Sequence, residues 1–185
     1  AICGGDLTGK MIVPVIERED GKYSYYLMKE THTIESSELE KAFKDIRGIG
    51  YYPYQTTESE YEEMRKNPEK VDEAFHSVMS STLKDWLDII RQKVPEDTKV
   101  IVCPGNDDRT LVDDAIREHK DVINAEGKII NIDELHEMIS TGWVNPSPWN
   151  TAREEEDDKL EARLEKYISQ VKDMNSAIFN FHAPP

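Results

Sequence analysis

The segment K-V-I-V-C-P-G, residues 99–105, constrains the fold more than any other part of the chain. Its four apolar residues followed by Pro-Gly indicate a short buried strand that ends in a turn. Apolar residues at helical spacing precede it over residues 72–93 and follow it over residues 111–116 and 152–172. Because strands that alternate with helices are typical of layered α/β folds, we predict that class.

Further elements follow from shorter patterns. Two β-prone runs, Met11–Ile16 and Tyr23–Met28, are separated by a turn containing Asp-Gly, which predicts a β-hairpin. Residues 51–68 are polar and contain two prolines, so we expect a loop with one short helix over Ser59–Lys66. The Leu135–Ser140 segment is compatible with either a strand or a helix.

Composition limits the functional classes. The chain has 185 residues, enough for one domain with a substantial core, and its formal net charge is −15. This charge disfavours sequence-independent binding to nucleic acid or to anionic membranes, so any phosphate-bearing ligand must be attracted locally. No apolar run has the length of a membrane span, and no signal-peptide pattern opens the sequence. We therefore expect a cytoplasmic protein that does not bind membranes.

Three apolar runs end in side chains that commonly bind metal ions. Asp6 follows A-I-C-G-G, Asn106 follows V-I-V-C-P-G, and His182 follows A-I-F-N-F. If the three strands are parallel neighbours, these side chains meet at one edge of the sheet. A carboxylate, an amide oxygen and an imidazole suit a divalent ion such as manganese, iron or zinc. The glycines directly before Asp6 and Asn106 allow sharp backbone turns that aim these two side chains at this edge.

The order of these motifs resembles that of the calcineurin-like metallophosphoesterases. G-G-D-L-T-G is similar to the second motif of that family, P-G-N-D-D to the third, and F-H-A-P-P to the fourth. The resemblance implies a layered α/β/β/α sandwich with a helical insertion over residues 30–95, which we expect to form a cap. It also implies that two divalent metal ions bind, with Asp6 bridging them and Asn106 and His182 as further ligands. The implied activity is hydrolysis of phosphate mono- or diesters, with a small phosphate ester or a nucleotide as substrate.

The resemblance has two gaps. Asp107 stands where the family carries a histidine near the leaving group, so it is either a general acid with a raised pKa or a supporting carboxylate. Asp108 matches an acidic position of the family and is expected to orient its neighbours at the catalytic site. The first motif, Asp-x-His, and the last, Gly-His-x-His, are absent. We therefore expect the single domain over residues 1–185 to be incomplete at both ends.

Three alternatives stay open. The string G-G-D-L-T-G-K resembles most of a phosphate-binding P-loop, which requires a helix directly after Lys10. Alternatively, the missing motifs fit a non-catalytic, phosphoesterase-like interaction module. For the loop before the last helix, we expect Trp149 to pack and Arg153 to form an ion pair, with a substrate contact as the other possibility for both.

Overall fold

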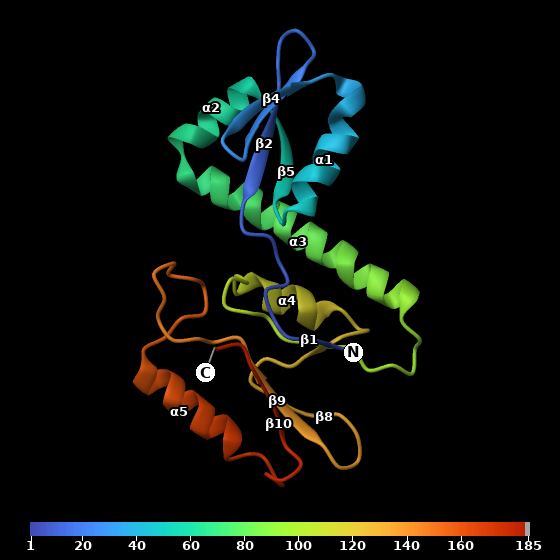
Figure 1. Cartoon of the computed structure of the whole chain (residues 1–185), viewed down its shortest axis with the longest axis vertical. Helices are drawn as coiled ribbons and strands as arrows, with labels where there is room; N and C mark the ends of the chain where they lie inside the picture. Colours follow the sequence, from blue (N-terminus) through green and yellow to red (C-terminus); the bar gives the residue numbers. More distant parts are fainter. Residues whose placement is uncertain (184–185) are drawn as a thin grey trace. The chain divides into compact units, whose positions relative to one another are not determined.

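The chain forms two compact units of mixed α/β structure, shown in Figure 1. The structure is a computed structural model that describes residues 1–183, so Pro184 and Pro185 of F-H-A-P-P lie outside the described residues. We call Thr8–Thr82 the insertion unit, and Ala1–Leu7 together with the chain from Leu83 onward the core unit. The predicted α/β class is confirmed, and the described chain has two compact units, with the insertion unit placed in the sequence between the two segments of the core unit.

The insertion unit is built on a four-stranded sheet with the order β4-β3-β2-β5. The strands are β2 (Ile12–Glu17), β3 (Tyr23–Leu27), β4 (Glu30–Ile34) and β5 (Tyr52–Thr57), and the helical segments are η1 (Ser36–Glu38), α1 (Leu39–Gly48), α2 (Glu58–Lys66) and the start of α3 (Pro68–Lys93). Strands β2 and β3 pair antiparallel, as the hairpin prediction requires. The short predicted helix is confirmed as α2.

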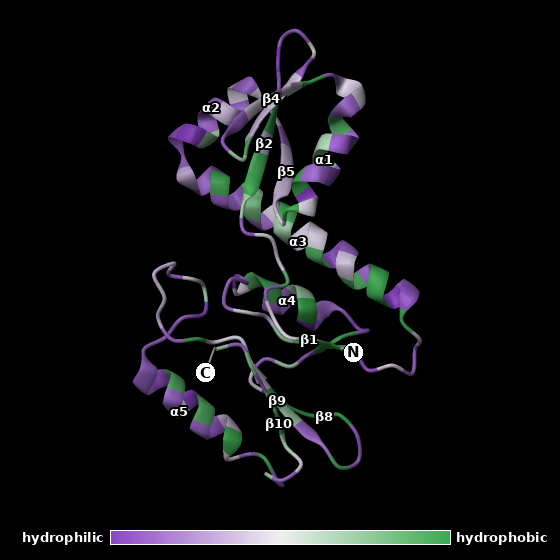
Figure 2. Ribbon diagram, viewed as in Figure 1, coloured by the Kyte–Doolittle hydropathy of each residue, from purple (hydrophilic) through white to green (hydrophobic). Residues whose placement is uncertain are grey.

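One face of this sheet packs against α1. Val13 and Val15 of β2 alternate toward that face, where they join Tyr23 and other buried residues in one hydrophobic cluster. Figure 2 shows the apolar stretch of β2 and the apolar stripe on α1. The amphipathic pattern of α1 is therefore satisfied within its own unit.

Strand β5 was not predicted, because Pro53 and the polar residues around it indicated a loop. The strand pairs in parallel with β2 from Ile12↔Tyr52 to Glu17↔Thr57. A proline is tolerated because β5 is an edge strand of the sheet, where a missing N–H leaves no ladder bond broken on the open side. A helical insertion was expected over residues 30–95. The observed insertion unit covers residues 8–82 and contains strands as well as helices.

The core unit contains two small sheets. Strands β1 (Ile2–Cys3), β6 (Ile101–Val102) and β7 (Ile123–Asn124) form a parallel sheet in the order β1-β6-β7. Strands β8 (Ile129–Asn131), β9 (Glu137–Thr141) and β10 (Ile178–Phe181) form the second sheet in the order β10-β9-β8. Leu135–Ser140, which the sequence left open, contributes mainly to strand β9.

A shared hydrophobic cluster joins the two sheets of the core unit. Ile101 and Cys103 pack there with Ala125 and Met138. Helix α4 (Leu111–Glu118) packs against β7 through its buried residues, and the hydroxyl of Tyr167 in α5 (Asp157–Ile168) lies against Gly127. Helix α5 is shorter than the helix predicted over residues 152–172.

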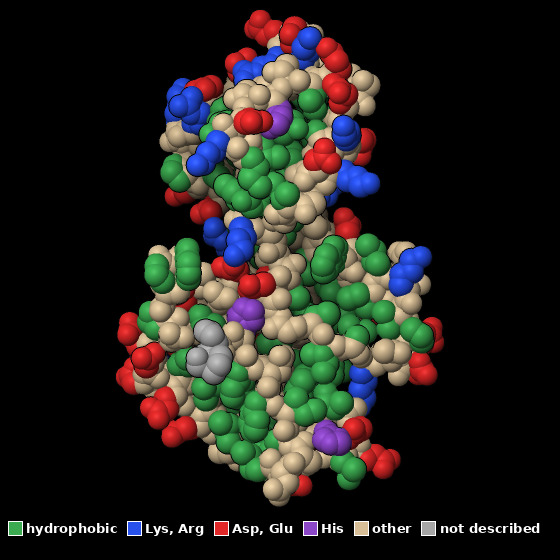
Figure 3. Space-filling view, viewed as in Figure 1, with side chains coloured by type: hydrophobic (Ala, Val, Ile, Leu, Met, Phe, Trp, Pro, Cys, Tyr) green, Lys and Arg blue, Asp and Glu red, His purple; other side chains and the backbone are tan. Residues whose placement is uncertain are grey.

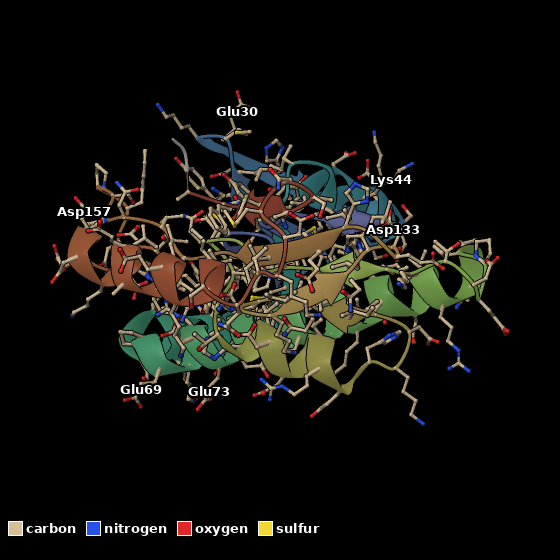
Figure 4. All side chains as sticks on the ribbon, turned by 90° about the horizontal axis from the view of Figure 1, so that it is seen from below. Glu30, Lys44, Glu69, Glu73, Asp133 and Asp157 are labelled. Atoms are coloured by element: carbon tan, nitrogen blue, oxygen red, sulfur yellow. The ribbon has the colours of Figure 1, made fainter. Side chains whose placement is uncertain are left out.

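Acidic side chains account for much of the described surface. Figure 3 shows Asp and Glu side chains gathered over α5, whose first turn carries Asp157 and Asp158. In Figure 4 the labelled Asp157 lies at one end of helix α5, at the margin of the view. Acidic residues in the first turn of a helix interact favourably with the positive end of the helix dipole. The acidic residues at the start of α5 are therefore explained as part of a solvent-exposed helix face. None of the helices in the described part of the chain is long and apolar enough to cross a membrane.

Candidate metal site

The three residues predicted to bind metal come together in the core unit. Asn106 Oδ1 lies 2.9 Å from His182 Nε2, and Asp6 Oδ1 lies 3.3 Å from the same nitrogen. Around an ion with bonds of about 2.1 Å, neighbouring ligand atoms are about 3.0–3.4 Å apart. The spacing of these oxygen and nitrogen atoms therefore fits a shared coordination shell.

The strands that deliver these residues are arranged differently from the expectation. Strands β1 and β6 are parallel neighbours, so Asp6 and Asn106 follow adjacent strand ends. Strand β10, which precedes His182, pairs with β9 in the other sheet. The backbone N–H of His182 donates to Thr141 O and extends that pairing past the strand end. The site thus lies where two sheets meet, and not at the edge of one sheet.

Hydrogen bonds on the outer side of the site fix which atoms face inward. His182 Nδ1 lies 3.2 Å from the carbonyl oxygen of Gly4, which can only accept, so we assign the Nδ1 proton to this bond. In the neutral imidazole, Nε2 then carries a lone pair. Asn106 Nδ2 donates to Thr151 Oγ1 at 3.0 Å, which leaves Asn106 Oδ1 on the inner side. Such bonds are typical of histidine and amide ligands in metal sites.

The result is a small cluster of acceptors facing one another. Asp6 Oδ1, Asn106 Oδ1 and His182 Nε2 all bring lone pairs to the same space, and a bound cation would relieve their mutual repulsion. A mixed oxygen and nitrogen set suits manganese, iron or zinc. Among residues 1–183, no group of three or more His, Cys, Asp or Glu side chains could hold a metal ion. The present cluster contains two such side chains, and an amide is its third member.

Two glycines make this close packing possible. A Cβ on Gly5 would lie 2.5 Å from His182 Nδ1, and Gly5 also has a φ of +131°, which favours glycine. A Cβ on Gly105 would lie 2.9 Å from His182 Nε2 and closer still to Asp6 Oδ1. Gly105 is therefore required for close approach of the side chains, whereas only Gly5 is required for the turn.

Backbone groups of the P-G-N-D-D segment hold Asp6 in place. The Asp107 N–H donates to Asp6 Oδ1 at 3.3 Å, and Asp6 itself has a φ of 51°, a conformation that aspartate tolerates better than most residues. The half-buried Asp107 thus borders the cluster directly. Asp107 remains the candidate for a catalytic carboxylate.

Asp108 has a different environment. Its side chain is fully buried, and Oδ2 accepts hydrogen bonds from the N–H of Gly105 at 2.7 Å and from the N–H of Leu7 at 3.0 Å. These bonds join the loop after β6 to the loop after β1. We therefore assign to Asp108 the positioning of the two loops that carry Asp6 and Asn106, and not contact with a reacting group.

Replacing Asp108 with alanine should destabilise the protein by about 2–4 kcal/mol, because the substitution leaves the buried N–H of Gly105 and the partly buried N–H of Leu7 without their acceptor. Urea denaturation measures the free energy of unfolding. The matched control is Asp114→Ala, whose carboxylate is exposed and pairs only with Arg117 three residues later, so a change within about 0.5 kcal/mol is expected. Equal losses in the two variants would contradict the positioning role.

The two residues considered as possible substrate contacts, Arg153 and Trp149, have different environments. Arg153 is 2% exposed and its Nη2 lies 2.9 Å from Asp113 Oδ2, so the expected ion pair is confirmed. Its Nε also donates to the carbonyl oxygen of Asp108. Trp149 is 80% exposed, so the expected packing role is wrong. The hydrophobicity of an indole predicts burial, but the proline-containing loop holds Trp149 away from the core.

Sequence reasoning missed Thr151 and Glu154 as supports of the site. Thr151 receives the Asn106 hydrogen bond, and its N–H and hydroxyl donate to Glu154 Oε1 at 2.8 and 2.7 Å. Hydrogen bonds from Ser147 and Thr151 lower the pKa of Glu154 to about 2, so this carboxylate is ionised at neutral pH. The only sequence signal was a serine between the two prolines and a threonine after them, close to an acidic residue.

The buried cysteine does not add a ligand. Cys103 Sγ lies 3.6 Å from Glu126 Oε2, and burial, together with this carboxylate, raises the pKa of the thiol far above its usual range. Glu126 also accepts hydrogen bonds from Thr141 Oγ1 and from the N–H of Gly142. Cys103 is therefore a protonated core residue in this environment.

Comparisons with known proteins give little further information. No family model and no curated protein matches the chain. A solved structure of a protein with no stated activity matches with 17% sequence identity and a TM-score of 0.48, covering 95% of this chain and 70% of the other. At this level the match carries no argument about the function.

Proposed function

We propose that the chain is part of a metal-dependent phosphoesterase that resembles the calcineurin-like family. The convergence of Asp6, Asn106 and His182 carries the proposal, because three ligand atoms share one space while the Nδ1 of His182 and the Nδ2 of Asn106 are already engaged on the outer side. A second support is the order of the motifs along the chain. A third is the layering of the core unit, with two sheets that share a hydrophobic cluster and with α4 and α5 beside them.

In this proposal Asp6, Asn106 and His182 would hold a divalent manganese, iron or zinc ion, and the family resemblance implies a second ion that would share Asp6. The ions supply a Lewis acid and a water of lowered pKa for attack on phosphorus. The chain's own residues keep these ligands in position. The Asp107 N–H orients the Asp6 carboxylate, and Asp108 ties the two loops together. The side chain of Asp107 stands where the family uses a histidine, and it either protonates the leaving group or supports the ligands.

The P-loop alternative does not fit the observed geometry. Strand β2 begins at Ile12, two residues after Lys10, whereas a P-loop requires a helix whose N-terminal N–H groups face the phosphate. The non-catalytic module remains a second candidate. It is favoured by the small number of ligands, since the described residues supply three for one ion and none of the other four histidines joins them.

Metal binding and hydrolysis test the proposal in two separate measurements. We expect Mn²⁺ or Zn²⁺ to raise the melting temperature of metal-free protein, because ions that bind only the folded state stabilise it. We also expect Mn²⁺-dependent hydrolysis of 4-nitrophenyl phosphate or bis(4-nitrophenyl) phosphate that is lost with a chelator. Metal binding without hydrolysis of either ester would support the interaction module. If the ions neither raise the melting temperature nor support hydrolysis, the proposed metal site is overturned.

A further inference from the structure

We propose that Trp149 is a stacking platform that gives the site a preference for phosphate esters carrying a planar aromatic group or a nucleobase. This inference rests on the proposed phosphoesterase function and deepens it by naming the substrate class. It starts from the observation that an indole ring with 80% exposure stands on a loop that is hydrogen-bonded to a candidate metal ligand.

The exposure of Trp149 is unusual for its residue type. Tryptophan buries a large apolar area when it can, and its exposure forgoes that stabilisation. The residues beside it in sequence are exposed as well, and they are the polar Asn150 and the small Pro148. The immediate sequence neighbours therefore add no large apolar side chain to the ring. A single flat ring of a small ligand matches the size of the indole.

The loop that carries Trp149 is held in one shape. Ser147 donates from both its N–H and its hydroxyl to Glu154, and Thr151 donates to Glu154 in the same way. Since the pKa of Glu154 is lowered to about 2, this carboxylate remains a full acceptor at neutral pH. The backbone N–H of Trp149 donates to Ser147 Oγ at 3.2 Å. A ring on such a loop needs little further ordering when a ligand stacks on it.

The same loop is connected to the candidate metal site. Thr151 Oγ1 accepts from Asn106 Nδ2 at 3.0 Å, and Asn106 Oδ1 faces His182. Trp149 is two residues from Thr151, so their Cα atoms are at most about 7 Å apart. The backbone of Trp149 therefore lies within the length of a nucleotide from Thr151, and in this proposal the ring is turned toward the place where the phosphate is expected. Phosphate binding and ring stacking would then act on opposite ends of one small substrate.

Kinetics with paired substrates test this proposal in the full chain. For 4-nitrophenyl phosphate, Trp149→Ala should raise KM about tenfold, because loss of stacking on a base typically costs about 1–3 kcal/mol. Trp149→Phe should restore most of the affinity, and KM for glycerol 3-phosphate should not change in either variant. Trp86→Ala serves as the matched control, since Trp86 is 57% exposed on α3 and should affect neither substrate. Equal KM changes for the aryl and glycerol esters would overturn the stacking role.

A binding measurement separates this inference from the proposed function. Adenosine monophosphate should quench the intrinsic tryptophan fluorescence of wild-type protein, whereas glycerol 3-phosphate should not, and Trp149→Phe should lose most of the quenching. Quenching that depends on Trp149 in a protein without hydrolytic activity would support the platform and count against the phosphoesterase. Metal-dependent hydrolysis with no dependence on Trp149 in either measurement would support the phosphoesterase and overturn the platform.

Discussion

Replacing His182 with alanine, or Asp6 with asparagine, should lower metal-dependent phosphoesterase activity by more than about 100-fold. Changes in the partners of metal ligands already cost about 10–100-fold, whereas His182→Ala removes a ligand and Asp6→Asn removes the negative charge of one. Both positions belong to the converging set, since His182 Nε2 lies within 3.3 Å of Asp6 Oδ1 and of Asn106 Oδ1. The melting-temperature increase on addition of Mn²⁺ should shrink in parallel with the activity.

The choice of asparagine at position 6 keeps the backbone effect small. Asp6 has a φ of 51°, which alanine tolerates poorly and asparagine tolerates well, so Asp6→Asn removes the charge without adding backbone strain. In metal-free protein neither variant should be markedly less stable than wild type, since His182→Ala removes one acceptor from a cluster of acceptors and Asp6→Asn replaces a carboxylate oxygen there with a donor. This pattern is typical of a site whose side chains are arranged for a ligand and not for stability.

His136 provides the control for a lost imidazole. Its Nδ1 lies 2.9 Å from Asp133 Oδ1 in an exposed turn of the core unit, apart from the three ligands. His136→Ala should therefore retain wild-type activity and the wild-type response to Mn²⁺. Activity that survives in both Asp6→Asn and His182→Ala would remove the proposed metal site, whatever the result for His136.

Local patterns in the sequence were sufficient to find the candidate ligands. A short apolar run followed by a glycine turn and a polar residue indicates that a side chain stands at a strand end, and this holds for Asp6 and Asn106. The assumption that all three strands are neighbours was wrong, because β10 pairs with β9 in a second sheet. Tertiary packing decides which strands pair, and the local pattern of apolar residues does not reveal that pairing.

The residues that support the ligands were beyond the reach of sequence patterns. Thr151 bonds to Asn106 across 45 positions of the chain, and His182 Nδ1 faces Gly4 across 178 positions. Neither contact belongs to a helix or strand period, so no periodicity marks it. Strand β5 was missed for a related reason, since only its position at the edge of a sheet makes Pro53 acceptable. Local chemistry was thus predictable where one segment decides it, and not where two distant segments meet.

Gly105→Ala should abolish metal binding and lower the free energy of unfolding by about 1–3 kcal/mol, the usual cost of overpacking. An added methyl group would lie 2.9 Å from His182 Nε2 and still nearer to the Asp6 carboxylate, in the space the ligand atoms share. Gly105 is buried, and its own N–H is bonded to Asp108, so the backbone has little freedom to move away. The methyl group therefore has to displace the ligands.

Gly48 in α1 is the matched control, because no heavy atom lies within 4 Å of the position where its Cβ would be. Gly48→Ala should leave metal binding unchanged and increase stability by up to about 1 kcal/mol, since alanine favours the helix more than glycine. Isothermal titration with Mn²⁺ and urea denaturation measure the two effects. If Gly105→Ala bound Mn²⁺ like wild type, the ion would not lie between Asp6 and His182. If Gly105→Ala lost Mn²⁺ binding but kept wild-type stability, the methyl group would displace the ligand side chains without straining the rest of the core unit. The loop after β6 would then be more flexible than the hydrogen bond between Gly105 and Asp108 implies.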